Sequence, residues 1–262
     1  MILRLLFSLF LILPLYGADD SWYNKVKVSI EADIYKPVLL GNIHNIVSKA
    51  TFKDDLAYND AKASKFVISL DLDYAYVPKI DISYFNLRSE KSVLLTKSTK
   101  IANGLFSSSV ISTISYQAYN IVLYQDFKLK GKRARVFGIP FYTGDFEFDV
   151  GLNTQVFQWN YNIRSLSNTT QTPSWIHVNA FLPLPYIGAK YFWYNYRASA
   201  KASALAFGKA KSSVYEASVD YRLVNGLYIS AGYLYEEFKT VEQSDTVNFI
   251  TSGYKFGFKY TF

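Results

Sequence analysis

The last nine residues of the chain, 254–262, place the strongest constraint on what it can fold into. Aromatic residues at positions 254, 256, 258, 260 and 262 alternate strictly with lysine, glycine, lysine and threonine. A period of two predicts a β-strand with one aromatic face and one small or charged face. The aromatic face continues to the final residue, whereas a strand of a soluble sheet normally ends in polar residues.

This ending resembles the C-terminal strand of Gram-negative outer-membrane β-barrels. The resemblance implies that Phe258, Tyr260 and Phe262 form an assembly signal, which the barrel-assembly machinery recognises during biogenesis. The alternative is an ordinary amphipathic strand, so the rest of the chain has to decide between the two interpretations.

The N-terminus has the pattern of a secretory signal. Arg4 precedes an apolar run from Leu5 to Tyr16, and small residues at positions 17 and 18 come before two aspartates. This run is too short for a transmembrane helix, which needs about 20 apolar residues. We therefore expect a signal peptide at 1–18, Sec-type export, and a mature barrel at 19–262. The chain has no cysteine, which excludes disulfides and a lipoprotein anchor but fits the outer membrane and the periplasm equally well.

Composition favours insertion into a membrane by strands. After the signal, no segment approaches 18 consecutive apolar residues, and closed barrels are the other structure that satisfies the backbone in lipid. Aromatic residues are 18% of the chain, yet the mean hydropathy is +0.03. That combination is typical of strands with one face in lipid and one toward a polar interior. The formal net charge of +7 comes without a dense basic run, so we expect no nucleic-acid partner.

Alternation along the chain predicts an all-β fold: a transmembrane up-and-down antiparallel β-barrel of about 10 strands, with 8 or 12 as alternatives. The predicted strands are 23–35, 65–76, 80–84, 115–125, 145–156, 176–182, 186–198, 215–223, 227–235 and 254–262. Pro37 is expected to stop the first strand, and a bulge or aromatic girdle is expected after Val156.

The predicted connections alternate in length. Tight turns are expected at 77–79, 183–185 and 224–226, and long polar connections at 88–112 and 199–212. Short periplasmic turns and long external loops produce such an asymmetry. The basic segment 126–144 is expected on the periplasmic side, as an extension of both strands or as a small plug.

Charged residues at every second position of several strands predict a polar lumen. The predicted lumen charge network consists of Lys25, Lys27, Glu31, Asp33, Asp71, Asp73, Asp81, Glu147, Asp149, Glu216, Asp220 and Arg222, with Lys255 and Lys259 as further partners. We interpret it as opposite charges that pair across a narrow barrel largely filled by side chains, in preference to a metal or acid–base site. No metal or cofactor is expected.

Several short motifs resemble an uncharacterised family of small Gram-negative outer-membrane proteins, which pairs a "DDLG" stretch with a proline turn and a following strand. The matching segments are 52–58 (FKDDLAY), 76–80 (YVPKI), 83–87 (SYFNL), 119–124 (YNIVLY), 149–152 (DVGL), 181–185 (FLPLP) and Phe262. The basic segment after Asp126 departs from that pattern. The resemblance implies location and fold, and it brings no activity with it.

The candidate catalytic groups are few. His177 is expected to face inward, but His177-Val-Asn179 lacks the serine of the His-x-Ser pair of lipid A deacylases. Trp159-Asn160 resembles a strand motif of outer-membrane phospholipases only weakly, because no serine lies at the matching spacing. No acidic cluster with histidine resembles the omptin proteases. We therefore assign no catalytic residue. The hypotheses are a structural or surface-exposed barrel, a small selective channel, and a lipid- or peptide-processing enzyme. Expected partners are outer-membrane lipid and lipopolysaccharide, with a monomer favoured.

Overall fold

A computed structural model describes residues 26–45, 48–72, 77–102, 104–136, 139–168, 170–207, 210–242 and 245–262. Within these ranges, no helix has the length and apolar character needed to cross a membrane. The strands are β1 (Val26–His44), β2 (Lys49–Thr51), β3 (Lys62–Leu72), β4 (Lys79–Ile101), β5 (Gly104–Leu129), β6 (Arg133–Val136), β7 (Ile139–Tyr142), β8 (Asp145–Ser165), β9 (Ser174–Trp193), β10 (Tyr196–Phe207), β11 (Ala210–Val224), β12 (Leu227–Glu242) and β13 (Asp245–Thr261).

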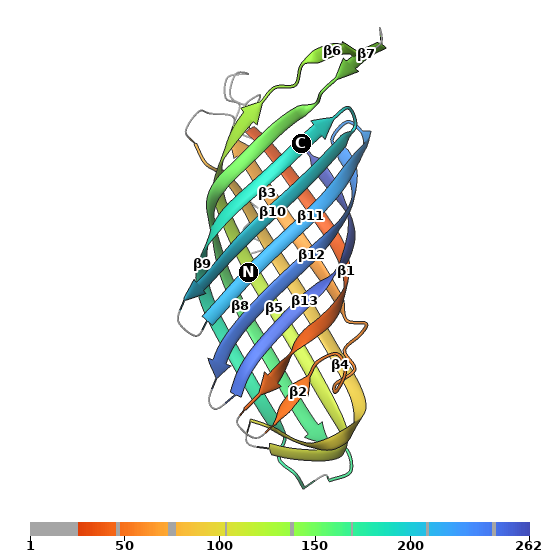
Figure 1. Cartoon of the computed structure of the whole chain (residues 1–262), viewed down its shortest axis with the longest axis vertical. Coiled ribbons are helices and arrows are strands. Elements are labelled where there is room, and N and C mark those ends of the chain that lie inside the picture. Colours follow the sequence, from red (N-terminus) through yellow and green to blue (C-terminus); the bar gives the residue numbers. More distant parts are fainter. Residues whose placement is uncertain are drawn as a thin grey trace, which may run out of the picture.

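Ten of these strands close into a ring (Figure 1). The main sheet has 11 strands in the order β13-β12-β11-β10-β9-β8-β5-β4-β3-β1-β2, and β13 also pairs with β1. The three-residue β2 lies beside the end of β1, so the ring contains the other ten strands. Each ring strand pairs antiparallel with the next one along the chain, and the closing pair runs from Ser29–Thr261 to His44–Thr246. The predicted all-β, up-and-down barrel of ten strands is confirmed.

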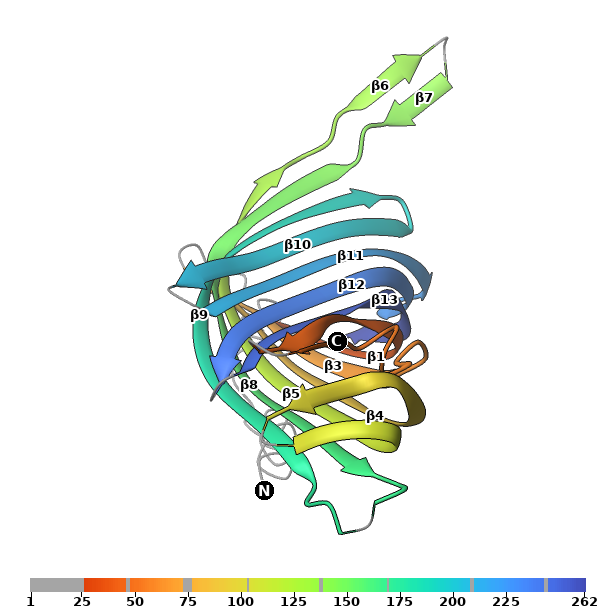
Figure 2. The ribbon, with the colours of Figure 1, turned by 60° about the horizontal axis from the view of Figure 1, so that its bottom comes forward.

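The two ends of the barrel differ. The end of β13, the β9–β10 turn and the β11–β12 turn share one end with the β6–β7 hairpin, which extends away from the ring (Figures 1 and 2). We call this the terminal end. The basic segment 126–144 therefore contains the last residues of β5 and the separate β6–β7 hairpin, and it ends just before β8 begins. The opposite end, where β2 and the tips of β4 and β5 lie, we call the far end.

Two of the predicted strand breaks at proline are wrong. β1 continues through Pro37 to His44, and β9 continues through Pro183 and Pro185, so the predicted sixth and seventh strands are one strand. Pro37 lies beyond the last β1–β3 pair, and Pro183 and Pro185 lie beyond the last β9–β10 pair. One edge of the strand is free of the ladder there, which is where a residue without an N–H group is tolerated.

The predicted long connections are also wrong, because strands occupy them. Segment 88–112 forms the far ends of β4 and β5, which pair as far as Ile101–Gly104. Segment 199–212 forms most of β10 and the start of β11, which pair as far as Phe207–Ala210. The strand gained at β10 replaces the one lost by merging two into β9, so the predicted total of ten holds. The two ends of the barrel thus differ mainly in how far the strands extend toward the far end, and less in the length of the connections between them.

Candidate functional site

The apolar residues of β8 change from the outer to the inner face of the barrel partway along the strand. Near the terminal end the outward, exposed residues are Phe146, Phe148, Val150, Leu152 and Val156; farther along, the inward, buried residues are Phe157, Trp159, Tyr161 and Ile163. β8 pairs with β5 over this whole length without a register shift, and the aromatic residues after Val156 point inward. The prediction of a bulge or an aromatic girdle after Val156 is therefore wrong. The apolar side chains of β8 thus lie on the outer surface near the terminal end and in the interior farther along.

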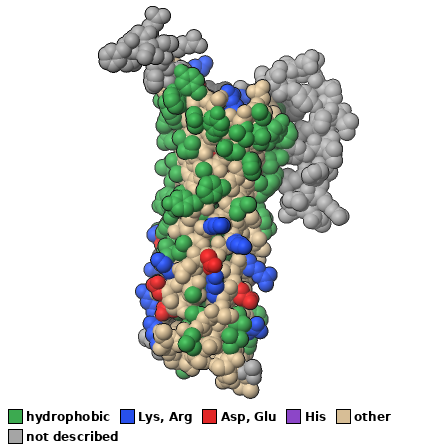
Figure 3. Space-filling model, turned by 90° about the vertical axis from the view of Figure 1, so that its right-hand side faces the viewer, with side chains coloured by type: hydrophobic (Ala, Val, Ile, Leu, Met, Phe, Trp, Pro, Cys, Tyr) green, Lys and Arg blue, Asp and Glu red, His purple; other side chains and the backbone are tan. Residues whose placement is uncertain are grey.

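The same exchange occurs around the ring. Near the terminal end, exposed apolar side chains form an outer surface that we call the apolar belt; its members include Ile34, Phe66, Ile82, Leu123, Ile187, Val219, Ile229 and Phe256. Toward the far end the outer surface carries charged and polar side chains instead (Figure 3). On β8 the belt runs from Phe146 to Val156, which is about 33 Å along the strand. If the strands tilt by about 45° from the barrel axis, as is usual, this length corresponds to about 23 Å along the axis.

Aromatic side chains border the belt at both edges. Ring pairs at the edge nearer the far end are Tyr84–Tyr119 (centroids 4.8 Å apart), Tyr233–Tyr254 (5.5 Å) and Tyr215–Tyr235 (5.8 Å). Ring pairs at the terminal edge are Tyr196–Tyr221 (5.0 Å), Trp193–Tyr196 (6.2 Å) and Tyr260–Phe262 (4.7 Å). Tyrosine and tryptophan favour such positions because one end of the ring is apolar and the other hydrogen-bonds to water.

Inside the belt the barrel is ionic. The Lys255 Nζ atom lies 2.8 Å from Glu31 Oε1, Asp33 Oδ2 and Glu216 Oε1, and its side chain is 1% exposed. Glu216 also pairs with Lys65. Because charges removed from water are costly unless they are paired, these contacts are what allows five ionic groups to share the interior.

Further ion pairs surround this centre. Lys79 bridges Asp71 (2.7 Å) and Asp126 (3.0 Å); Lys190 contacts Asp149 (2.9 Å) and Glu147 (3.8 Å); Arg197 pairs with Asp220; and Lys201 lies 3.5 Å from Asp81. The interior of the belt is therefore filled by paired side chains that come from most strands of the ring.

The structure places the predicted lumen residues as follows. Lys27, Glu31, Asp71, Asp81, Glu147 and Glu216 line an internal chamber, and Asp33, Asp149 and Asp220 are buried in the ion pairs just described. Arg222 lies at the terminal rim, where it donates to Asn195 Oδ1, and Lys25 and Asp73 lie outside the described residues. Six further interior charges were not predicted from the sequence: Lys65, Lys79, Asp126, Lys190, Arg197 and Lys201. Parity along each strand could have found Lys190, which alternates with outward Ile187, Ala189 and Tyr191.

The internal chamber is closed toward the far end. Its volume is about 320 Å³, and its walls include the exposed Lys27 and Lys128 near the terminal end. It shares Asp81, Lys201 and Glu216 with a second cavity of about 60 Å³, whose lining already includes apolar side chains such as Leu234. Toward the far end, inward side chains of the described residues form a buried apolar core, which includes Tyr35, Phe85 and Trp159.

The connection between β1 and β3 folds inward and completes this apolar core. We call residues 49–61 the inner plug. Phe52, Leu56 and Tyr58 are fully buried, and the Phe52 ring meets four others: Tyr58, Trp159, Tyr161 and Phe249, with centroids between 5.7 and 6.4 Å. The backbone joins the plug to β1, because the Phe52 N–H donates to the Gly41 carbonyl (3.2 Å) and the Leu39 N–H to the Tyr58 carbonyl (3.1 Å).

Side-chain hydrogen bonds fix the shape of the inner plug. The Asp55 carboxylate accepts from both the backbone N–H and the hydroxyl of Thr51, each at 2.8 Å, and closes a tight turn. The Tyr58 hydroxyl donates to Ser112 Oγ at 2.9 Å, and burial raises the pKa of that hydroxyl. Segment 52–58, which carries one of the motifs named above, thus packs inside the barrel.

His177 faces outward, so the prediction that it faces inward is wrong. It is exposed on β9 between Ile176 and Val178, which are the buried, inward residues. Its ring contacts the amides of Asn160 and Asn179. Ser115 on β5 pairs in register with Asn160, but no carboxylate and no hydroxyl forms a hydrogen bond with these three groups in the described part of the chain. No three possible ligands gather there as a metal site would require.

The residues of the predicted assembly signal lie on the outer face of β13. Phe258, Tyr260 and Phe262 are exposed at the terminal edge of the belt, and the Phe262 N–H donates to the Val28 carbonyl on β1 at 2.9 Å. The last strand of the chain therefore closes the ring against the first.

No protein-family model matches the chain, and no curated protein is significantly similar to it in sequence. Membership in the uncharacterised family therefore stays a prediction. Among solved structures, Ail, the attachment invasion locus protein of Yersinia pestis, has a TM-score of 0.37 and 9% identity over 91% of this chain and 99% of its own. The translocator domain of autotransporter NalP from Neisseria meningitidis has a TM-score of 0.43 and 11% identity over 90% of this chain and 88% of its own. The outer membrane protease OmpT from Escherichia coli has a TM-score of 0.36 and 9% identity over 89% of this chain and 97% of its own.

Proposed function

We propose that this chain is an integral barrel of the Gram-negative outer membrane, closed to solutes, whose far half projects from the membrane as a rigid surface structure. The exchange of apolar residues between the two faces of β8 carries this proposal. A strand is apolar outside and ionic inside where lipid surrounds the barrel, and polar outside and apolar inside where water surrounds it.

The thickness of the belt supports lipid as its surroundings. About 23 Å is close to the apolar band of about 25 Å in outer-membrane barrels, and the aromatic borders fall where such girdles are expected. Strands of 23 and 26 residues in β4 and β5 exceed the 9–11 residues that cross a bilayer, so the remainder must lie in water.

The orientation follows from the ends of the ring. Outer-membrane barrels with an even number of strands keep both termini on the periplasmic side. With the terminal end in the periplasm, the β6–β7 hairpin extends into the periplasm and the projecting half faces outward. Export by a signal peptide at 1–18 and recognition of the last strand by the assembly machinery belong to this proposal. A monomer suffices, because the ring closes within one chain.

The packed interior disfavours the channel hypothesis. A solute that entered the 320 Å³ chamber would have to pass the paired charges around Lys255 and then the apolar core with its inner plug. For the enzyme hypothesis, the candidate base His177 faces outward with the amides of Asn160 and Asn179 as its partners, and no carboxylate orients its ring in the described part of the chain.

Two measurements test the proposal together. The folded protein, extracted in detergent from an outer-membrane fraction, is expected to migrate differently on gels before and after heating, as closed barrels do. The same preparation is expected to give no conductance steps in a planar bilayer. Recovery of the processed protein from a periplasmic extract without detergent would contradict the membrane location, and regular conductance steps from the wild-type protein would contradict the closed interior.

A further inference from the structure

Three basic side chains lie next to one another on the outer surface, just beyond the apolar belt. Lys62 on β3 pairs in register with Arg88 on β4. Lys36 on β1 occupies the next position of the β1–β3 ladder after the last pair, Tyr35–Ala63. All three are exposed, so they form a continuous row across three adjacent strands, which we call the basic row.

In the described part of the chain, no residue of the basic row forms an ion pair. Two acids close to it already have partners, since Glu90 accepts a hydrogen bond from the Thr113 hydroxyl and Asp60 pairs with Lys91. Like charges at directly opposite positions of a sheet repel each other. The row is therefore suited to an anion with more than one charge, which would offset the repulsion of the whole row.

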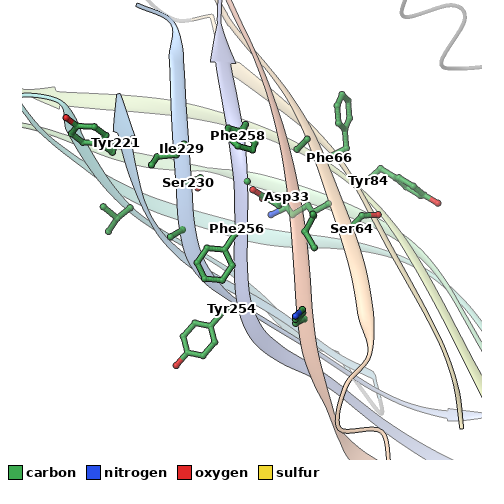
Figure 4. Close-up of a pocket in the computed structure, with 17 residues that line it drawn as sticks. Asp33, Ser64, Phe66, Tyr84, Tyr221, Ile229, Ser230, Tyr254, Phe256 and Phe258 are labelled. Atoms are coloured by element: carbon green, nitrogen blue, oxygen red, sulfur yellow. The ribbon is translucent and has the colours of Figure 1, made fainter. Parts of the chain in front are cut away.

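A groove of about 1210 Å³ lies in the apolar belt and reaches the basic row. Its floor contains small residues, Ala32 and Gly257. Phe66 and Tyr84 lie on one side and Tyr221 and Ile229 on the other, and the aromatic residues of β13 form a ridge between them (Figure 4). Phe256 on that ridge is 63% exposed. Lys36 lines the groove as well, so hydrocarbon lying in the groove would be attached to a headgroup beside the basic row.

A row of amides lies between the aromatic border and the level of the basic row. Asn86, Gln117, Gln158 and Asn179 pair with one another in register on β4, β5, β8 and β9. Ser64 pairs with Asn86 and also lines the groove, which connects this row to it. Amide side chains both donate and accept hydrogen bonds, so a run of them suits a headgroup with many hydroxyls.

From these three features we infer that the outer surface of β1, β3 and β4 binds a phosphorylated glycolipid of the outer leaflet. This inference rests on the membrane location and the orientation proposed above. The acyl chains lie in the groove, the phosphates contact Lys36, Lys62 and Arg88, and the sugar hydroxyls face the amide row. Basic side chains bind lipid phosphates at a membrane surface by charge, and apolar surface takes up the chains.

The test uses the full-length folded protein in detergent and measures retained lipid by native mass spectrometry. The probes are bisphosphorylated lipid A, its dephosphorylated form and phosphatidylglycerol. Wild-type protein is expected to retain bisphosphorylated lipid A in preference to the other two. The triple variant Lys36→Gln/Lys62→Gln/Arg88→Gln is expected to bind it about 100-fold more weakly, given the usual contribution of each basic residue near an anionic surface.

A matched control removes three positive charges elsewhere. Lys97→Gln/Lys100→Gln/Lys239→Gln changes exposed residues near the far end, away from the belt, and is expected to retain lipid A like the wild type. A second variant, Ala32→Trp, fills the floor of the groove and is expected to reduce retention while the basic row stays intact.

The outcomes separate this inference from the proposal on which it rests. Equal retention of lipid A by the triple variant and the control would overturn the glycolipid site, as would equal retention of phosphatidylglycerol by the wild type. A lipid-free dimer that Ala32→Trp disrupts would also overturn it, because a second copy would then occupy the groove. Loss of heat-modifiable migration in the wild type, in contrast, would contradict the membrane barrel itself.

Discussion

Replacement of Lys255 by methionine is expected to lower the free energy of unfolding by about 3–5 kcal/mol, the loss typical of removing one partner from a buried ionic group. The Lys255 side chain is 1% exposed and contacts Glu31, Asp33 and Glu216. Methionine has a similar volume, so the packing survives, but Glu31 and Asp33 then lack a salt-bridge partner among the described residues, and Glu216 keeps only Lys65. Urea unfolding of the protein in detergent, followed by the loss of heat-modifiable migration, measures the change.

The matched control is Lys211→Met. Lys211 pairs with Glu237 at 2.9 Å, but its side chain is 49% exposed, and such surface pairs contribute about 0–1 kcal/mol. If the two variants unfold at the same urea concentration, the ionic interior does not hold the ring strands together. A double variant, Lys255→Met with Glu216→Gln, should recover part of the loss, because it leaves fewer uncompensated charges.

The second large effect is expected at the inner plug. Phe52→Ala should lower the free energy of unfolding by about 3–5 kcal/mol, because it removes a fully buried ring and leaves a cavity. The cavity would open beside Trp159, whose ring centroid lies 6.2 Å from that of Phe52. Urea unfolding gives the stability change, and the fluorescence of Trp159 reports whether the plug still packs against it.

Leu94→Ala is the control for the plug. Leu94 is 67% exposed on the projecting half, so its truncation should change stability by less than about 0.5 kcal/mol. A small effect of Phe52→Ala, comparable to that of the control, would mean that residues 49–61 do not pack inside the barrel. The projecting half would then lack the core that keeps it rigid.

Alternation of residues predicted the class of fold, because the period of two is a local property of each strand. β13 alternates over its last nine residues, and Glu147 and Asp149 alternate with Phe146 and Phe148, so side-chain parity was readable without a structure. The total of ten strands held only because two errors offset each other: two predicted strands form the single strand β9, and β10 was missed.

The same reasoning failed where the environment of a strand changes along its length. In the sequence, Phe157 and Trp159 fall on the face of β8 opposite to that of Phe146. The sequence does not show that the apolar belt ends between these residues, so that the apolar side chains beyond it point inward. His177 was misplaced for this reason, because the apolar residues beside it were assumed to face outward. The pairing of charges could not be predicted either, since Lys255 and Glu216 are 39 residues apart in the chain and meet inside the ring from strands separated by β12.

Strand β10 was missed because its two faces differ little in composition. Its outward residues from Ala198 to Ala206 are all alanine, and its inward residues include Ser199, Lys201 and Ser203. Small and polar residues of this kind are typical of loops. The prolines of β1 and β9 led to predicted strand ends that do not exist, because a strand with one unpaired edge can contain proline.

The position of the belt in lipid is the central claim, and spin labels at single cysteines test it most directly. The chain has no cysteine of its own, so Ile187→Cys in the belt and Asn160→Cys on the projecting half can each carry one label. In reconstituted vesicles, the label at 187 should collide with oxygen dissolved in the bilayer, and the label at 160 with a water-soluble nickel chelate. Equal access of the chelate to both labels would contradict the account.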